Sequence, residues 1–243
     1  MVCLHGVTGH GGRFRRLAEE RLAARFRVVA LDLGGHGESS WEQPWTLERH
    51  LDDVRQTVSA LGIESSTWIG HSFGGRLVME LTARDPDRVA RTVLLDPAMW
   101  VPPSIAAELG RQYLAEQSFA SLDELVETRM VASGLARTPR GVLVEELAAQ
   151  AVTSEDGRVR YAYSGPAVAA AYTEMARRPP PFGDLGVPTL LVVGELSKIV
   201  SGAEVELMRA ALGELVSVEV VPGGHNVLWE AFAETADLVD GFL

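Results

Sequence analysis

Residues 70–74 read Gly-His-Ser-Phe-Gly, so that Ser72 stands between two glycines. An apolar run ends at this stretch and a helical pattern follows it. A nucleophilic serine on a sharp strand-to-helix turn needs flanking glycines, because side chains there would collide with the backbone. The turn lifts the hydroxyl above the sheet edge, near the positive end of the next helix. The pattern therefore predicts a nucleophile at Ser72, and a plain glycine-rich turn is the alternative interpretation.

A serine hydroxyl needs a base to take its proton, and six histidines are available. His225 lies in the loop Pro-Gly-Gly-His-Asn, directly after an apolar run at 217–221. Open α/β sheets place their active sites at the carboxyl ends of strands, so His225 is the expected base; a loop histidine that caps the last helix is the alternative. His71 lies on the turn itself and should point away from the serine. His50 lies on a charged helix face, where solvation is the simplest interpretation.

A second glycine-rich loop runs from His5 to Gly12, after the first apolar run. Exposed amides in such a loop can bind the oxyanion that forms during acyl transfer. We expect the backbone amides of Val7 and Phe73 to form this oxyanion hole. A phosphate-binding loop is disfavoured because the lysine of a Walker motif is lacking, and the glycine spacing fits a dinucleotide fingerprint poorly.

The strands and helices that position these residues can be predicted from short apolar runs that alternate with helical patterns. Such alternation is typical of parallel strands linked by crossover helices, and most of the runs are continuous, as in strands covered on both faces. The expected strands are Val2–Leu4, Val28–Leu31, Thr67–Gly70, Thr92–Leu95, Thr189–Val193 and Ser217–Val221. A helix is expected over 47–61, with Thr46 as its cap and Gly62 after its end. The sequence thus predicts an α/β fold with a mostly parallel, doubly wound sheet.

The regular alternation breaks between Val101 and Phe182, where helical patches occur and no strong strand is expected. The expected helices cover 106–117, 122–131, 142–151 and 168–177. We interpret 102–182 as a helical insertion that divides an α/β core into the two parts 1–101 and 183–243. Five arginines of the insertion are interpreted as solvated rather than carboxylate-binding: Arg137, Arg158, Arg160, Arg177 and Arg178.

The 243 residues include 22 basic and 33 acidic side chains, a net charge of −11. This balance disfavours nucleic acid and anionic membrane surfaces as partners, and no apolar run approaches the ~20 residues of a membrane span. The single cysteine, Cys3, excludes an intrachain disulfide, and the histidines lack metal-ligand spacing. Because no signal-peptide pattern is present, we expect a cytoplasmic protein. We also expect a small-molecule substrate, no cofactor and no metal.

Four stretches together resemble the α/β-hydrolase superfamily. They are His-Gly at 5–6, Asp-Leu-Gly-Gly-His-Gly-Glu-Ser at 32–39, Gly-His-Ser-Phe-Gly-Gly at 70–75 and Gly-Gly-His-Asn-Val-Leu-Trp-Glu at 223–230. Within the superfamily the pattern is similar to small-molecule esterases, meta-cleavage-product hydrolases and cofactor-free haloperoxidases. The match follows the chain order and leaves the insertion unmatched. The resemblance implies an enzyme whose inserted cap shapes the substrate pocket.

The resemblance also implies a catalytic acid after the strand before the last one, in a pattern like Gly-Glu-x-Asp. Here residues 194–200 read Gly-Glu-Leu-Ser-Lys-Ile-Val, with Ser197 at the position of the acid. Asp96 ends an earlier strand and resembles the alternative acid site of some dehalogenases and lipases, although many relatives have an aspartate there for structural reasons. Glu195 lies close to the usual position. We rank Asp96 ahead of Glu195, and a site with no acid is the remaining alternative.

Relatives carry a two-stranded hairpin before the His-Gly loop, whereas here that loop begins at residue 5. Either the natural start lies upstream or the sheet lacks two edge strands. In the second case Val28–Leu31 would be an exposed edge, and copies of the chain would tend to form a homo-oligomer through it.

These observations predict hydrolysis of a small carboxylic ester, thioester or lactone. Ser72 would attack the carbonyl carbon and His225 would carry the proton, with the oxyanion held by backbone amides. Carbon–carbon bond hydrolysis or a lyase reaction on the same site is one alternative. A non-catalytic ligand-binding protein is the other, and Ser197 is the residue that keeps it open.

Overall fold

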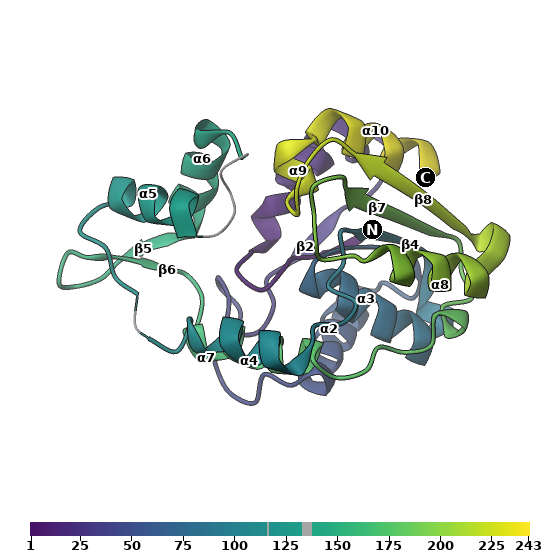
Figure 1. The fold of residues 1–243 in the computed structure, drawn as a ribbon, viewed down its shortest axis with the longest axis horizontal. Helices are drawn as coiled ribbons and strands as arrows, with labels where there is room; N and C mark the ends of the chain where they lie inside the picture. Colours follow the sequence, from purple (N-terminus) through teal and green to yellow (C-terminus); the bar gives the residue numbers. More distant parts are fainter. Residues whose placement is uncertain (116, 133–137) are drawn as a thin grey trace.

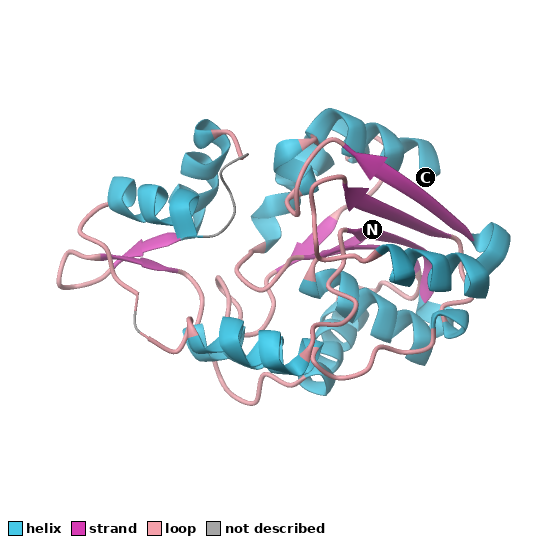
Figure 2. Ribbon diagram, in the orientation of Figure 1, coloured by secondary structure: helices cyan, strands magenta, loops and turns pink. Residues whose placement is uncertain are grey.

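The computed structural model of the protein describes residues 1–115, 117–132 and 138–243. Six strands form one sheet in the order β2-β1-β3-β4-β7-β8, and every neighbouring pair is parallel (Figures 1 and 2). The strands are β1 Val2–Leu4, β2 Val29–Leu31, β3 Ser66–His71, β4 Val89–Leu95, β7 Thr189–Gly194 and β8 Val216–Val221. All six expected strands are present, and the predicted parallel α/β sheet is confirmed.

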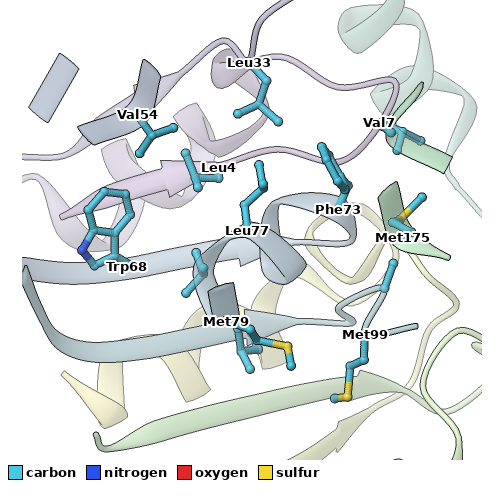
Figure 3. Close-up of a cluster of buried hydrophobic side chains, with 14 of the residues drawn as sticks. Leu4, Val7, Leu33, Val54, Trp68, Phe73, Leu77, Met79, Met99 and Met175 are labelled. Atoms are coloured by element: carbon cyan, nitrogen blue, oxygen red, sulfur yellow. The ribbon is translucent and has the colours of Figure 1, made fainter. Parts of the chain in front are cut away.

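Helices cover both faces of this sheet, because its strands direct apolar side chains to both sides. Leu4 and Leu94 face a core shared with α2, α3 and α8, and Figure 3 shows Leu4 beside Leu77 of α3 in that core. Cys3 and Val93, one residue earlier in their strands, face a second core shared with segment 11–22, α9 and α10. The helices are α2 Leu47–Ala60, α3 Phe73–Arg84, α8 Gly202–Leu212, α9 Val227–Glu230 and α10 Phe232–Phe242. The short helix α1 covers Arg15–Leu17 within segment 11–22.

Helix α2 begins and ends as the sequence indicates, but one of its residues was misread. The Thr46 hydroxyl accepts a hydrogen bond from the Arg49 N–H, and Gly62 after the helix has a φ of 69°. His50 is buried rather than solvated, and its ring lies 5.5 Å from that of Phe73. Burial lowers the pKa of His50 to about 4. The residue follows buried Leu47 by three positions and therefore shares its face.

Between β4 and β7 the described residues form four α-helices and a small antiparallel hairpin. The elements are α4 Pro103–Arg111, α5 Leu122–Ala132, α6 Arg140–Gln150, β5 Ala151–Thr153, β6 Val159–Tyr161 and α7 Gly165–Met175. In Figure 1, α5, α6 and the hairpin lie to the left, away from the six-stranded sheet, and α4 packs beside α7. Sequence analysis expected no strong strand here and missed this hairpin, because three-residue strands with partly exposed side chains give too short a pattern to detect.

Strand β2 lies at the edge of the sheet, next to β1. Its central residue Ala30 is exposed, and the two flanking residues are half-buried. Association between copies of the chain through this edge stays a prediction. Among the described residues, no helix is both long and apolar enough to cross a membrane.

Candidate active site

Ser72 occupies a strained turn between β3 and α3, with φ 55° and ψ −118°. Two of the neighbouring glycines are required by close contacts. A side chain on Gly70 would come within 2.4 Å of the Gly74 carbonyl oxygen, and one on Gly74 would come within 2.0 Å of the Leu4 carbonyl oxygen. The glycine spacing therefore lets helix α3 start directly against the sheet, with Ser72 at its first turn. A positive φ at a non-glycine residue costs free energy and is frequent at functional sites.

His225 connects Ser72 to Asp96. Its Nδ1 lies 2.6 Å from Asp96 Oδ2, and its Nε2 lies 2.9 Å from Ser72 Oγ. A carboxylate can only accept, so the Nδ1 proton is donated to Asp96, and the unprotonated Nε2 accepts the serine hydroxyl. The three side chains thus form one hydrogen-bond chain that joins β3, β4 and the loop after β8.

The carboxylate of Asp96 is fully buried and held by two further donors. The Gly194 N–H donates to Oδ1 at 3.2 Å, and the Ser197 hydroxyl donates to Oδ2 at 2.6 Å. Glu195 is exposed, and within the described residues it is not a hydrogen-bond partner of His225. Of the acid candidates, the structure thus brings Asp96 to the histidine, and Ser197 contacts Asp96 rather than His225. Asp96 also has a positive φ of 42°.

Two residues that sequence reasoning misjudged or missed hold the His225 loop in place. His71 was expected to point away from the site, yet its Nε2 donates to the His225 carbonyl oxygen at 2.9 Å, and the two rings lie 4.8 Å apart. Burial keeps the pKa of His71 well below its usual value, and a proton on the neighbouring His225 would lower it further, so the His71 ring stays neutral. The Glu230 carboxylate accepts the Gly224 N–H at 2.6 Å and the Thr138 hydroxyl at 3.1 Å. Glu230 ends the stretch 223–230 that carries part of the family resemblance, and this position was the available signal for it.

The loop after β1 lies directly against the nucleophile. A side chain on Gly6 would come within 2.9 Å of Ser72 Cβ and 3.4 Å of its Oγ. His36 Nε2 donates to the Val7 carbonyl oxygen at 2.7 Å and so fixes this loop. Val7 lines the same pocket as Ser72, and Phe73 is the first residue of α3, whose amide has no intrahelical acceptor. That these two amides form an oxyanion hole stays a prediction.

A pocket of about 970 Å³ opens above Ser72 and His225. Apolar side chains from the segment after β4 and from α4 and α7 form much of its wall: Trp100, Val101, Ile105, Leu109 and Met175. The insertion therefore supplies much of the wall, and the core supplies the reacting groups. Within the described residues, no group of three or more His, Cys, Asp or Glu side chains could hold a metal ion.

The arginines of the insertion divide into surface residues and one pocket residue. Exposed Arg158 binds Ser118. Half-buried Arg160 binds Asp156, and exposed Arg177 binds Glu48 and Glu174. Arg178 is exposed, and Arg137 lies outside the described residues. Sequence reasoning missed Arg129, which lines the pocket. Its helical spacing was the available signal, because it follows the fully buried Leu125 by four positions and Val126 by three.

Comparisons with known proteins agree with the fold. A family model described as the alpha/beta hydrolase fold matches residues 1–232. Lipase LipV of Mycobacterium tuberculosis is 35% identical over 178 residues, which cover 73% of this chain and 67% of the lipase. The 2-(acetamidomethylene)succinate hydrolase of Mesorhizobium japonicum is 27% identical over 240 residues, covering 96% of this chain and 84% of that protein. A crystal structure of E-2-(acetamidomethylene)succinate hydrolase superposes with a TM-score of 0.87 at 24% identity, covering 100% of this chain and 90% of that chain.

Proposed function

The chain belongs to the α/β-hydrolase fold family, and from this premise we propose that it is a serine hydrolase of small carboxylic esters, thioesters or lactones. One observation carries the proposal: Ser72, His225 and Asp96 form an unbroken hydrogen-bond chain, with contacts of 2.9 and 2.6 Å, at the wall of a large pocket. Relatives named as a lipase and as a hydrolase support a hydrolytic reaction.

The reaction follows from the roles of these groups. Ser72 Oγ attacks the carbonyl carbon while its proton passes to His225 Nε2. The buried carboxylate of Asp96 stabilises the imidazolium that forms, and it holds the ring in the correct tautomer. The amides of Val7 and Phe73 donate to the oxyanion of the tetrahedral intermediate. His225 then gives its proton to the leaving oxygen or sulfur, and water repeats the same steps on the acyl-enzyme.

The contact of Asp96 with His225 counts against the binding-protein alternative. That alternative depended on the serine at position 197, where relatives carry the acid. The contact of Asp96 with His225 supports a complete Ser-His-Asp set whose acid comes from β4. Ser197 then serves as a hydrogen-bond donor to the acid.

The test compares the wild-type protein with Ser72→Ala, using p-nitrophenyl butyrate and a fluorophosphonate probe. We expect the wild type to hydrolyse the ester and to gain one covalent adduct on Ser72, located by peptide mass spectrometry. The variant should do neither. Ser59→Ala, an exposed serine on α2, is the matched control and should behave as wild type. Wild-type protein that neither turns over the ester nor takes the label would contradict the proposal.

A further inference from the structure

The turn that carries Val7 is held through its carbonyl groups. Val7 and Thr8 are the central residues of this turn, in which the Gly9 N–H donates to the Gly6 carbonyl oxygen at 2.9 Å. His36 Nε2 donates to the Val7 carbonyl oxygen at 2.7 Å. Both of these contacts are made within the α/β core. The Thr8 carbonyl is the next one along the turn, and its partner comes from a different part of the molecule.

The Thr8 carbonyl is held by the insertion. Gln150, the last residue of α6, is buried, and its Nε2 donates to the Thr8 carbonyl oxygen at 3.1 Å. Arg13 of the core donates to the same oxygen at the longer distance of 3.5 Å. Arg129 of α5 donates to the Thr8 hydroxyl at 2.8 Å. A buried side-chain amide needs hydrogen-bond partners, and Gln150 finds one in the turn that lies against the nucleophile.

Glu146 contacts the same part of the core from one helical turn earlier. It precedes Gln150 by four positions and therefore shares its face of α6. Its carboxylate lies 2.9 Å from Arg13 Nε and 3.2 Å from His10 Nε2, and the side chains of Arg13 and Glu146 are only 6% and 9% exposed. Burial alone would raise the pKa of Glu146, but Arg13 and His10 together lower it, so the carboxylate stays charged. Helix α6 thus has two polar anchors on segment 8–13.

Helix α6 itself is not part of the pocket wall. None of its residues, all of which the structure describes, lines the pocket, and Figure 1 shows the helix apart from the six-stranded sheet. Its contacts with the turn are therefore not contacts with a substrate. Its Leu143 and Leu147 belong to the same apolar cluster as Leu125 of α5, and α5 lines the pocket through Thr128 and Arg129. Helix α6 therefore joins the ligand-contacting part of the insertion to the turn of the core.

We propose that Gln150 is a positioning residue for the reaction. Through the Thr8 carbonyl it fixes the turn 6–9, so that the Val7 amide meets the oxyanion, and Glu146 is the second anchor through Arg13. This inference rests on the proposed function and on the oxyanion role of Val7 within it. It adds that the insertion acts on the chemical step as well as forming the pocket wall.

The experiment compares Gln150→Met with wild type by two measurements. The first is kcat and KM for p-nitrophenyl butyrate. The second is Ki for 1,1,1-trifluoroheptan-2-one, whose carbonyl carbon bonds Ser72 Oγ while the serine proton passes to His225, so that the former carbonyl oxygen becomes an oxyanion. Gln56→Met is the matched control, since Gln56 is an exposed residue of α2.

Gln150→Met should lower kcat roughly tenfold, because a buried carbonyl loses its donor and the oxyanion amide is displaced rather than removed. The Ki of the ketone should rise by about the same factor, and KM should change by less than about threefold, as for an interaction made only in the transition state. A residue that merely supports the fold or the pocket would leave the Ki of the ketone in step with KM. An unchanged Ki in a folded Gln150→Met variant overturns the inference.

Glu146→Gln and Glu145→Gln test the second anchor by the same chemical change at adjacent positions of α6. Glu145 is exposed and should behave as wild type when it is replaced. Glu146→Gln should raise the Ki of the ketone roughly three- to tenfold, because a neutral acceptor replaces a charged one beside Arg13. Equal Ki values for these two variants contradict the role of α6 in the inference.

A measurement on the wild type covers the case in which Gln150→Met does not fold. Hydrogen–deuterium exchange of residues 140–150 is followed by mass spectrometry with and without the trifluoromethyl ketone. Because α6 does not line the pocket, slower exchange there in the adduct reports that it is coupled to the oxyanion turn. We expect exchange to slow in α6 and to stay the same in α2. Exchange of α6 that does not respond to the ketone overturns the inference.

The two proposals fail in different ways. A wild-type protein that hydrolyses the ester, together with a folded Gln150→Met variant that has wild-type kcat and Ki, refutes the positioning role alone. A wild-type protein that neither hydrolyses the ester nor takes the fluorophosphonate label overturns the serine-hydrolase proposal, and the positioning role with it.

Discussion

Replacing Ser197 tests how the carboxylate beside His225 is held. The Ser197 hydroxyl donates to Asp96 Oδ2 at 2.6 Å, and the same oxygen accepts from His225 Nδ1 at 2.6 Å. The Gly194 N–H donates to the other oxygen at 3.2 Å. Ser197→Ala removes one of these three donors and leaves the other two in place.

The size of the effect follows from these contacts. A hydrogen bond to a charged group contributes about 1.5–3 kcal/mol, which limits the loss of kcat/KM to roughly 100-fold. Because Asp96 keeps two donors, including the imidazole whose charge develops in the transition state, we expect a loss of about 3- to 30-fold. Ser197→Asp should lose more activity. Two carboxylates about 4 Å apart repel each other by about 4 kcal/mol near a protein surface, so one of them must take up a proton.

The kcat/KM values of the variants are measured from initial rates with p-nitrophenyl butyrate. Ser197→Thr keeps the hydroxyl and serves as the matched control. The expected order of kcat/KM is wild type and Ser197→Thr first, then Ser197→Ala, then Ser197→Asp. A Ser197→Ala variant as fast as wild type would show that the bond to Asp96 has no catalytic effect. A Ser197→Asp variant faster than wild type would refute the reasoning, because position 197 would then be the better place for the acid.

Three further predictions concern the surroundings of the site. Glu230→Ala should lower kcat for p-nitrophenyl butyrate roughly tenfold, because the His225 loop loses a charged hydrogen-bond acceptor; an unchanged kcat contradicts this role. His50 has a folded-state pKa of about 4, below the usual ~6.5 of the unfolded chain. As the pH falls from 6.5 to 4, the imidazole therefore takes up a proton in the unfolded state before it does so in the folded state, and the free energy of unfolding decreases. His50→Gln should reduce this decrease by about 3 kcal/mol, as measured by urea titration at several pH values. Identical pH dependence of the wild type and the variant would contradict this prediction. Gly74→Ala should destabilise the fold by about 1–3 kcal/mol or more, because the added side chain would meet the Leu4 backbone. Gly141→Ala lies in open space on α6 and should stabilise the fold by about 0.5–1 kcal/mol. Equal melting temperatures of the two variants would count against this reasoning.

The inner strands of the sheet, β1, β3, β4 and β7, could be predicted because they are largely covered on both faces, and such strands leave continuous apolar runs in the sequence. The turn at Ser72 could be predicted as well, since the glycines that it needs are next to it in the chain. The β5–β6 hairpin could not, because its short strands carry little periodic signal. Local pattern therefore identified the elements whose burial is extensive.

The acid could only be ranked from the sequence. Asp96 and Glu195 both follow apolar strands, and which strand end faces His225 depends on contacts between residues 129 positions apart. His50 was misjudged and Arg129 was missed for a related reason. Their helical spacing places them on buried faces, but a charged or titratable residue on such a face is identified only when the packing partner is known.

Asp96→Asn tests the central claim, that Asp96 completes the site of Ser72 and His225, most directly. Asparagine tolerates the positive φ of 42° found at this position, so the fold should persist, with a melting temperature within a few degrees of wild type. The neutral amide cannot stabilise an imidazolium and favours the wrong tautomer of His225. We predict that kcat for p-nitrophenyl butyrate falls by up to ~10⁴-fold in a protein that remains folded. A folded Asp96→Asn variant that loses less than about tenfold in kcat would contradict the account, since this is far below the loss expected for a triad acid.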